Sequence, residues 1–188
     1  MTFIRHSPLA LFAALLVAGL FPAAPSSTPQ AGEPVPATTI ILVRHAERIA
    51  NNGDLPLSEA GRERAALLAR MLGHTRVSHV FTSEMVRTRE TAAPLATQLA
   101  LTPVAVPVAQ SDLLVSRLDQ LPAGAVALVV NHGGAIPGII QKLGAPAPAA
   151  IAEDQFDRLF VVTRAAAGRP SVVEMRYGKP PEAAAPQE

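Results

Sequence analysis

Two uninterrupted runs of β-branched and aliphatic residues constrain the fold of this chain more than any other feature. Residues 39–43 read TIILV, and residues 125–130 read AVALVV. Runs without polar alternation are typical of strands that are buried on both faces, as in parallel sheets. Parallel strands need crossover connections, which are usually helices. The sequence therefore predicts an α/β fold, a three-layer α/β/α sandwich around a mostly parallel central sheet.

The segments between these runs alternate in the same way. Ser58 can cap a helix that continues to about Leu72, where Gly73 ends it. Arg64, Arg70 and Arg76 are expected to form a solvated helix face. Further helices are predicted at residues 85–99, with a bend at Pro94, at 113–121 and at 135–143, and further strands at 77–82, 104–106, 160–164 and 172–177.

The N-terminal residues predict an exported protein. Arg5 precedes an apolar run at residues 9–21, which is shorter than the ~20 residues that a membrane-spanning helix needs. We therefore expect a signal peptide at 1–24, a Pro-rich flexible linker at 25–38, the working domain at 39–179 and a disordered tail at 180–188. The protein is expected in the periplasm or outside the cell, with membrane contact only through the signal segment if it stays uncleaved.

Composition excludes several classes of function. The 188 residues include no Cys, so disulfides, thiolate nucleophiles and Cys-ligated metals are excluded. The formal net charge of +1 and the lack of a basic stripe argue against nucleic-acid binding. His74 and His79 have no third ligand nearby in the sequence, so we expect no metal and no cofactor.

Polar residues follow three of the predicted strands, where parallel sheets gather their ligand sites. They are Arg44 and His45 after the first run, Thr82, Ser83 and Arg87 after the second strand, and Asn131, His132, Gly133 and Gly134 after AVALVV. Arginine can direct two donors onto a phosphate group, and a neutral imidazole can attack phosphorus to form a phosphohistidine. The pattern therefore indicates phosphoryl transfer on a small phosphorylated substrate.

Four segments occur in this order: ILVRHAER, DLPLSEAGR, FTSEMVRTRETA and LVVNHGG. Together they resemble the successive motifs of the histidine phosphatase (phosphoglycerate mutase-like) superfamily, and the resemblance extends over residues 39–177. The closing EDQFDRLFVVT looks like the C-terminal part of small bacterial members. The resemblance implies a phosphatase that acts on a phosphomonoester, a phosphohistidine or a phosphosugar through an intermediate on His45. It places Arg44, Arg87 and His132 around the phosphate. Further candidates for substrate binding are Asn51, Ser83, Glu84, Asn131 and Gly133.

The chain departs from the family pattern at two points. Ala46 follows the predicted nucleophile where members usually have Gly. Many members carry a Glu after the second helix that protonates the leaving group, but residues 99–124 contain none. Asp112 is the natural candidate for this acid, and Glu84 is its rival. If neither serves, substrates with good leaving groups, such as a phosphohistidine or an acyl phosphate, become more plausible.

Two other functions compete with a phosphatase. A phosphoglycerate mutase-type phosphotransferase would need loops that enclose its substrate, for which this domain has little room. A catalytically weak phospholigand-binding module would keep Arg44 and Arg87 and tolerate the loss of the proton donor, but it would not need His45 as a nucleophile. The sequence leaves the physiological substrate and the oligomeric state open.

Overall fold

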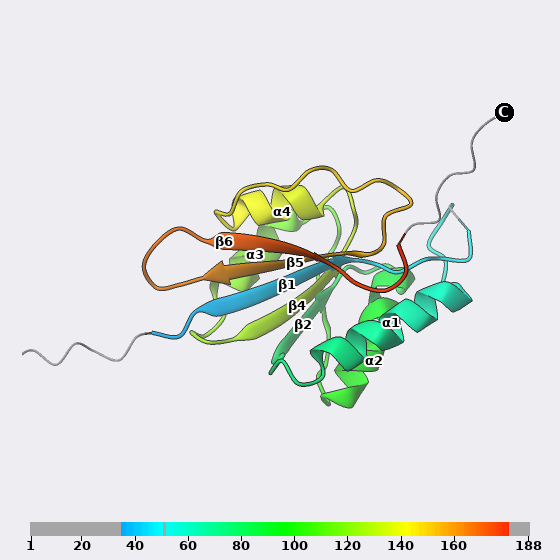
Figure 1. Cartoon of the computed structure of the whole chain (residues 1–188), viewed down its shortest axis with the longest axis horizontal. Helices are drawn as coiled ribbons and strands as arrows, with labels where there is room; N and C mark the ends of the chain where they lie inside the picture. The colour runs from blue at the N-terminus through cyan, green and yellow to red at the C-terminus, as the bar shows by residue number, and fades with distance from the viewer. Residues whose placement is uncertain (1–34, 51, 181–188) are drawn as a thin grey trace, which may run out of the picture. The chain divides into compact units, whose positions relative to one another are not determined.

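The computed structural model describes residues 35–50 and 52–180, in which six strands form one sheet in the order β3-β2-β4-β1-β5-β6 (Figure 1). The strands are β1 (Thr38–Arg44), β2 (His79–Thr82), β3 (Val104–Ala105), β4 (Val126–Asn131), β5 (Arg158–Arg164) and β6 (Ser171–Arg176). The helices are α1 (Glu59–Leu72), α2 (Val86–Gln98), α3 (Ser111–Asp119) and α4 (Ile136–Lys142). Strands β3, β2, β4 and β1 are parallel, whereas β5 and β6 are antiparallel to their neighbours. The predicted mostly parallel sheet is thus confirmed.

The register of the two central strands brings the predicted site residues together. Arg44, the last residue of β1, lies opposite Asn131, the last residue of β4. The backbone N–H of His45 donates to the carbonyl of Asn131 at 2.9 Å, so pairing continues one residue beyond the strand. Since β1 and β4 are parallel, His45 and His132 leave the same edge of the sheet side by side.

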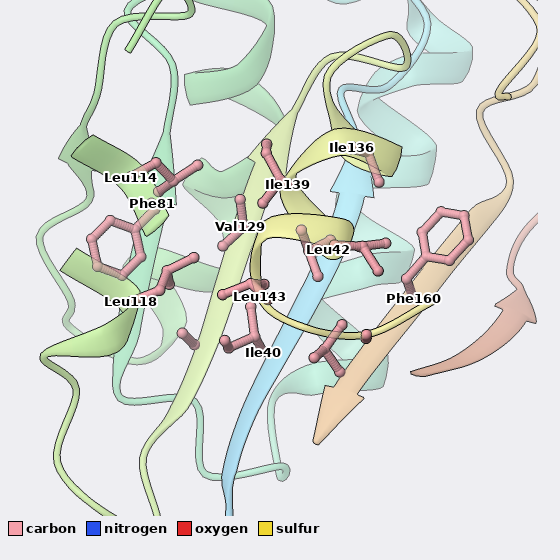
Figure 2. Close-up of a cluster of buried hydrophobic side chains, with 14 of the residues drawn as sticks. Ile40, Leu42, Phe81, Leu114, Leu118, Val129, Ile136, Ile139, Leu143 and Phe160 are labelled. Carbon is pink, nitrogen blue, oxygen red and sulfur yellow. The ribbon is translucent and has the colours of Figure 1, made fainter. Parts of the chain in front are cut away.

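Both faces of the sheet are covered, which explains why β1 and β4 show no polar alternation. On one face, Ile40, Leu42 and Val129 pack with α3 and α4, whose buried side chains include Leu118 and Ile139 (Figure 2). On the other face, a second cluster forms against α1 and α2. Its sheet members are Ile41, Val43, Leu128 and Val130, and its helix members include Leu68, Leu72, Ala92 and Leu95. The three-layer arrangement is the predicted one.

Helix α1 contains a correction to the sequence analysis. Ser58 caps it as predicted, since its Oγ accepts the Gly61 N–H at 3.1 Å. Arg70 is exposed, but Arg64 is only 7% exposed and does not belong to a solvated face. The expectation for Arg64 was wrong because the carboxylate of Glu47, outside the helix, pairs with it at 2.7 Å.

The predicted signal peptide and almost all of the linker and tail lie outside the described residues, so these remain predictions. Within residues 35–50 and 52–180, no helix is long and apolar enough to cross a membrane.

Candidate active site

His45 follows β1 directly and is only 3% exposed. Its Nδ1 lies 2.8 Å from the carbonyl oxygen of Ala46. Because a carbonyl can only accept, Nδ1 carries the proton and donates it, and Nε2 keeps its lone pair. Burial lowers the pKa of His45 to about 3, and the nearby positive charges act in the same direction. At neutral pH the ring is therefore uncharged, with a nucleophilic nitrogen at Nε2.

Arg44 is held rigidly by the connection between α4 and β5. Its Nη1 donates to the carbonyls of Ala152 at 2.7 Å and Gln155 at 3.3 Å. Its guanidinium carbon lies 4.2 Å from the centroid of the Phe156 ring. Its Nε is buried without a hydrogen-bond partner among the described residues. The hydrogen bonds and the ring contact thus fix two sides of the guanidinium.

His132 is oriented by Arg87 and Ser83. Arg87 Nη2 lies 3.3 Å from His132 Nδ1, and since a guanidinium only donates, Nδ1 accepts. The proton then resides on Nε2, which donates to Ser83 Oγ at 3.0 Å. Ser83 Oγ is itself held by the Met85 N–H at 3.2 Å and by Thr88 Oγ1 at 2.9 Å. Burial, with the charge of Arg87 next, lowers the pKa of His132 to about 4. This ring is also neutral at pH 7.

The two histidines face one another across the edge of the sheet. Their ring centroids are 5.4 Å apart, with the planes inclined at 62°. Gly133 lies against Arg44, and a Cβ at this position would make ordinary van der Waals contact with Arg44 Cδ at 3.4 Å. Asn131 has a local role in this structure, since its Oδ1 accepts the His132 N–H at 2.8 Å.

The two candidate acids occupy different surroundings. Asp112 lies in the first turn of α3, where its side chain is 90% exposed and pairs with Lys142 at 2.6 Å. Glu84 is next to Ser83, and its charge raises the pKa values of both His132 and Arg87. Glu84 thus lies within electrostatic reach of His132, whereas the carboxylate of Asp112 pairs with Lys142. Asn51 lies outside the described residues.

Three residues near the histidines were missed in the sequence analysis. Asp54 pairs with Arg87 at 3.4 Å and accepts the Val86 N–H at 2.9 Å. Phe156 packs on Arg44, and its ring centroid is 6.0 Å from that of His45. The charge of Arg48 acts to lower the pKa values of both Arg44 and Arg87, so it lies within electrostatic reach of them. All three stand in segments quoted above, ILVRHAER, DLPLSEAGR and EDQFDRLFVVT, but only the tertiary structure brings the loops that carry Asp54 and Phe156 to the site.

No group of three or more His, Asp or Glu side chains in the described part of the chain is arranged to hold a metal ion. Whether the activity needs a metal is untested, and independence from metal stays a prediction.

The sheet and its covering helices define a phosphoglycerate mutase-like α/β fold. The sequence model of the histidine phosphatase superfamily (branch 1) matches residues 40–114, which include His45 and Arg87. The match assigns this segment, residues 40–114 of 188, to the histidine phosphatase superfamily. No curated protein sequence matches it significantly.

Solved structures with similar folds include two phosphatases and a mutase. A mycobacterial glucosyl-3-phosphoglycerate phosphatase is 18% identical with a TM-score of 0.57, over 68% of this chain and 90% of that one. The protein histidine phosphatase SixA, complexed with tungstate, is 19% identical with a TM-score of 0.57, over 73% and 96%. A phosphoglycerate mutase from Plasmodium falciparum is 19% identical with a TM-score of 0.54, over 76% and 91%. At these identities the likeness establishes the fold.

Proposed function

We propose that the protein is a phosphatase that hydrolyses a phosphomonoester through a phosphohistidine on His45. The observation that carries this proposal is the hydrogen bond from His45 Nδ1 to the Ala46 carbonyl, 2.8 Å long, because it leaves Nε2 as the nucleophile. A ring whose pKa is lowered to about 3 needs no deprotonation before it attacks. A neutral, fixed imidazole beside arginine side chains suits attack on phosphorus.

In the first step, the Nε2 lone pair forms a bond to phosphorus while the bond from phosphorus to the leaving oxygen breaks. In the second step, the oxygen of a water molecule attacks phosphorus, the bond to Nε2 breaks, and the proton that the water loses goes to the carboxylate that protonated the leaving group. Inorganic phosphate leaves and His45 is neutral again. Arg44 and Arg87 offset the charge on the phosphoryl oxygens, each with a buried Nε that lacks a partner among the described residues.

His132 is proposed to contact the same phosphoryl group. Its Nδ1 is occupied by Arg87 and its Nε2 by Ser83 in this structure. Binding of a dianionic group favours protonation of a ring whose pKa is otherwise about 4. His132 can then donate to the phosphate while it remains oriented by Ser83.

We propose Glu84 as the acid that protonates the leaving group, in place of Asp112. Its Oε2 accepts the Val108 N–H at 2.9 Å, which holds the carboxylate of this residue, two positions after β2, against the segment that follows β3. The negative charge of Glu84 acts to raise the pKa values of His132 and Arg87, whereas the carboxylate of Asp112 forms an ion pair with Lys142.

The substrate is proposed to be a small phosphorylated molecule. The mycobacterial phosphatase that shares the fold has been solved with inorganic phosphate and with VO3, and SixA with tungstate, all of them oxyanions. The activities for which these proteins are named, on glucosyl-3-phosphoglycerate and on protein histidine, support phosphate chemistry for this chain and are compatible with a phosphosugar or a phosphohistidine.

The test is a trapping experiment with p-nitrophenyl phosphate in the presence of EDTA. Rapid quenching and intact mass measurement should reveal a phosphoenzyme that is stable to base and labile to acid. His45→Asn should abolish both the phosphoenzyme and turnover. The matched control His74→Asn, at an exposed position, should retain both.

Three results would contradict the proposal or part of it. Normal turnover in His45→Asn would exclude this residue as the nucleophile. Phosphate binding without any turnover would favour a phospholigand-binding module. Activity that EDTA removes and zinc or magnesium restores would overturn metal independence.

We also propose that the protein is exported, on the basis of Arg5 and the apolar run at residues 9–21. Cell fractionation with N-terminal sequencing tests this. A mature chain that begins between residues 24 and 38 is expected outside the cytosol, and cytosolic protein with Met1 intact would contradict export.

A further inference from the structure

Arg48 carries a guanidinium that the described residues leave without a partner. Its backbone is fixed, because it forms an isolated antiparallel bridge with Leu57 and the next residue, Ile49, donates to the Pro56 carbonyl at 3.1 Å. Its side-chain Nε is buried, yet no described residue accepts a hydrogen bond from it. No ion pair joins Arg48 to any carboxylate within the part of the chain that the structure describes.

The guanidinium groups of Arg44 and Arg87 have hydrogen-bond or ion-pair partners that Arg48 lacks among the described residues. Arg44 donates to two carbonyls, and Arg87 pairs with Asp54. Arg48 is close enough to depress the pKa values of both, and also that of His132. Like charges held near one another in a partly buried place destabilise the folded protein unless an anion offsets them. An unpartnered third guanidinium is therefore a feature that a ligand would explain.

The charge of Arg48 comes in addition to the charges of Arg44 and Arg87, the two arginines proposed to bind the transferred phosphoryl group. A phosphoryl monoester near neutral pH carries about two negative charges, since its second pKa is about 6. Arg44 and Arg87 supply two positive charges. The carboxylates that act on these two arginines are Asp54 and Glu84 for Arg87, and Glu153 and Asp154 for Arg44. None of these four carboxylates forms an ion pair with Arg48, so its charge has no carboxylate partner among the described residues.

We propose that Arg48 binds a second anionic group of the substrate, a carboxylate or a second phosphate, next to the phosphoryl group that His45 accepts. This inference rests on the proposed function and assigns its substrate class: phosphomonoesters that carry another negative charge a few bonds from the ester oxygen. A guanidinium suits this task because it offers parallel donors that fit a carboxylate or a phosphate.

The experiment uses substrates matched in size. Phosphoglycolate and 2-hydroxyethyl phosphate differ by a carboxylate in place of a hydroxymethyl group, and the bisphosphate of ethane-1,2-diol tests a second phosphate instead. The wild-type protein should show kcat/KM about 10- to 100-fold higher for at least one of the two anionic substrates, as expected for one charge-assisted hydrogen-bonded pair. Which of them is preferred identifies the second group.

Variants connect this preference to Arg48. Arg48→Gln should bring the ratio between the anionic and the neutral substrate close to one, and Arg48→Lys should restore part of it. Arg70→Gln, an exposed arginine on α1, is the matched control and should keep the wild-type ratio. Thermal melting of each variant shows whether it is folded.

Equal kcat/KM values for all three substrates in the wild-type protein would overturn the inference, while His45-dependent turnover would still support the phosphatase. A preference that persists in Arg48→Gln would also overturn it. Calorimetry of the same compounds with His45→Asn measures their binding affinities in the absence of turnover. An Arg48-dependent preference in binding, without any turnover in the wild type, would uphold the anion site and overturn the proposed phosphatase.

Discussion

Arg64 holds the carboxylate of Glu47, two residues after His45, through two sides of its guanidinium. Nε lies 3.0 Å from both Oε1 and Oε2 of Glu47, and Nη2 lies 2.7 Å from Oε1. The same group donates to the carbonyls of Tyr177 at 2.7 Å and Lys179 at 2.8 Å. One buried arginine thus joins α1, the segment after β1 and the chain after β6.

Arg64→Gln is expected to destabilise the protein. Loss of one partner from a buried ion pair costs about 3–5 kcal/mol, but the Glu47 side chain is 24% exposed, so we expect about 2–3 kcal/mol. Urea unfolding measures the change. The matched variant Arg70→Gln, at an exposed site on the same helix, should change stability by less than about 0.5 kcal/mol. Equal stability of the two variants would show that the ion pair contributes little.

Gly61→Ala should disturb the segment that follows His45. A Cβ on Gly61 would lie 2.0 Å from the carbonyl oxygen of Glu47, so either α1 or that segment must shift. Both stability and turnover should fall. Gly138→Ala in α4 is the control, because its Cβ would meet no atom within 4 Å and alanine stabilises a helix interior by about 0.5–1 kcal/mol relative to glycine. Similar effects of the two substitutions would contradict the close packing at Gly61.

The stability of the protein should fall between pH 7 and pH 5.5. The pKa is lowered from 6.5 to about 3 for His45 and to about 4 for His132, so the unfolded chain takes up protons in this range and the folded protein does not. Each histidine should contribute a loss of about 1 kcal/mol in the free energy of unfolding, and none above pH 8. In His45→Asn the loss should be about 1 kcal/mol smaller. A pH dependence identical to that of wild type would contradict a buried, neutral His45.

The role of Glu84 can be separated from that of Asp112 by the leaving group. Glu84→Gln should slow glycerol 3-phosphate hydrolysis by about 10²-fold or more and p-nitrophenyl phosphate hydrolysis much less, because nitrophenolate leaves without a proton. Asp112→Asn should affect neither substrate by more than a few-fold. The reverse pattern would return the acid role to Asp112, and an equal loss for both substrates in Glu84→Gln would indicate a binding role instead.

The strands and their order along the chain were accessible from sequence because both faces of β1 and β4 are buried. Residues 40–43 contain no polar side chain, Ser58 caps the helix that follows it, and the helix before Leu99 follows an apolar pattern. The helix predicted at 113–121 was displaced, since α3 is Ser111–Asp119. Helix ends are decided by local hydrogen bonds that a hydrophobic pattern does not encode.

That His45 and His132 leave the same edge of the sheet could be predicted from the sequence, because each directly follows a buried parallel strand. Tertiary structure alone decided what surrounds them. It placed Phe156 and the carbonyls of Ala152 and Gln155 on Arg44, more than 100 positions away in the chain. It also buried Arg64 against Glu47 and left Asp112 with Lys142. Burial of a strand or helix face imposes a pattern of apolar residues that can be recognised in the sequence. Hydrogen bonds and ion pairs between distant segments depend instead on where the loops lie once the layers have packed.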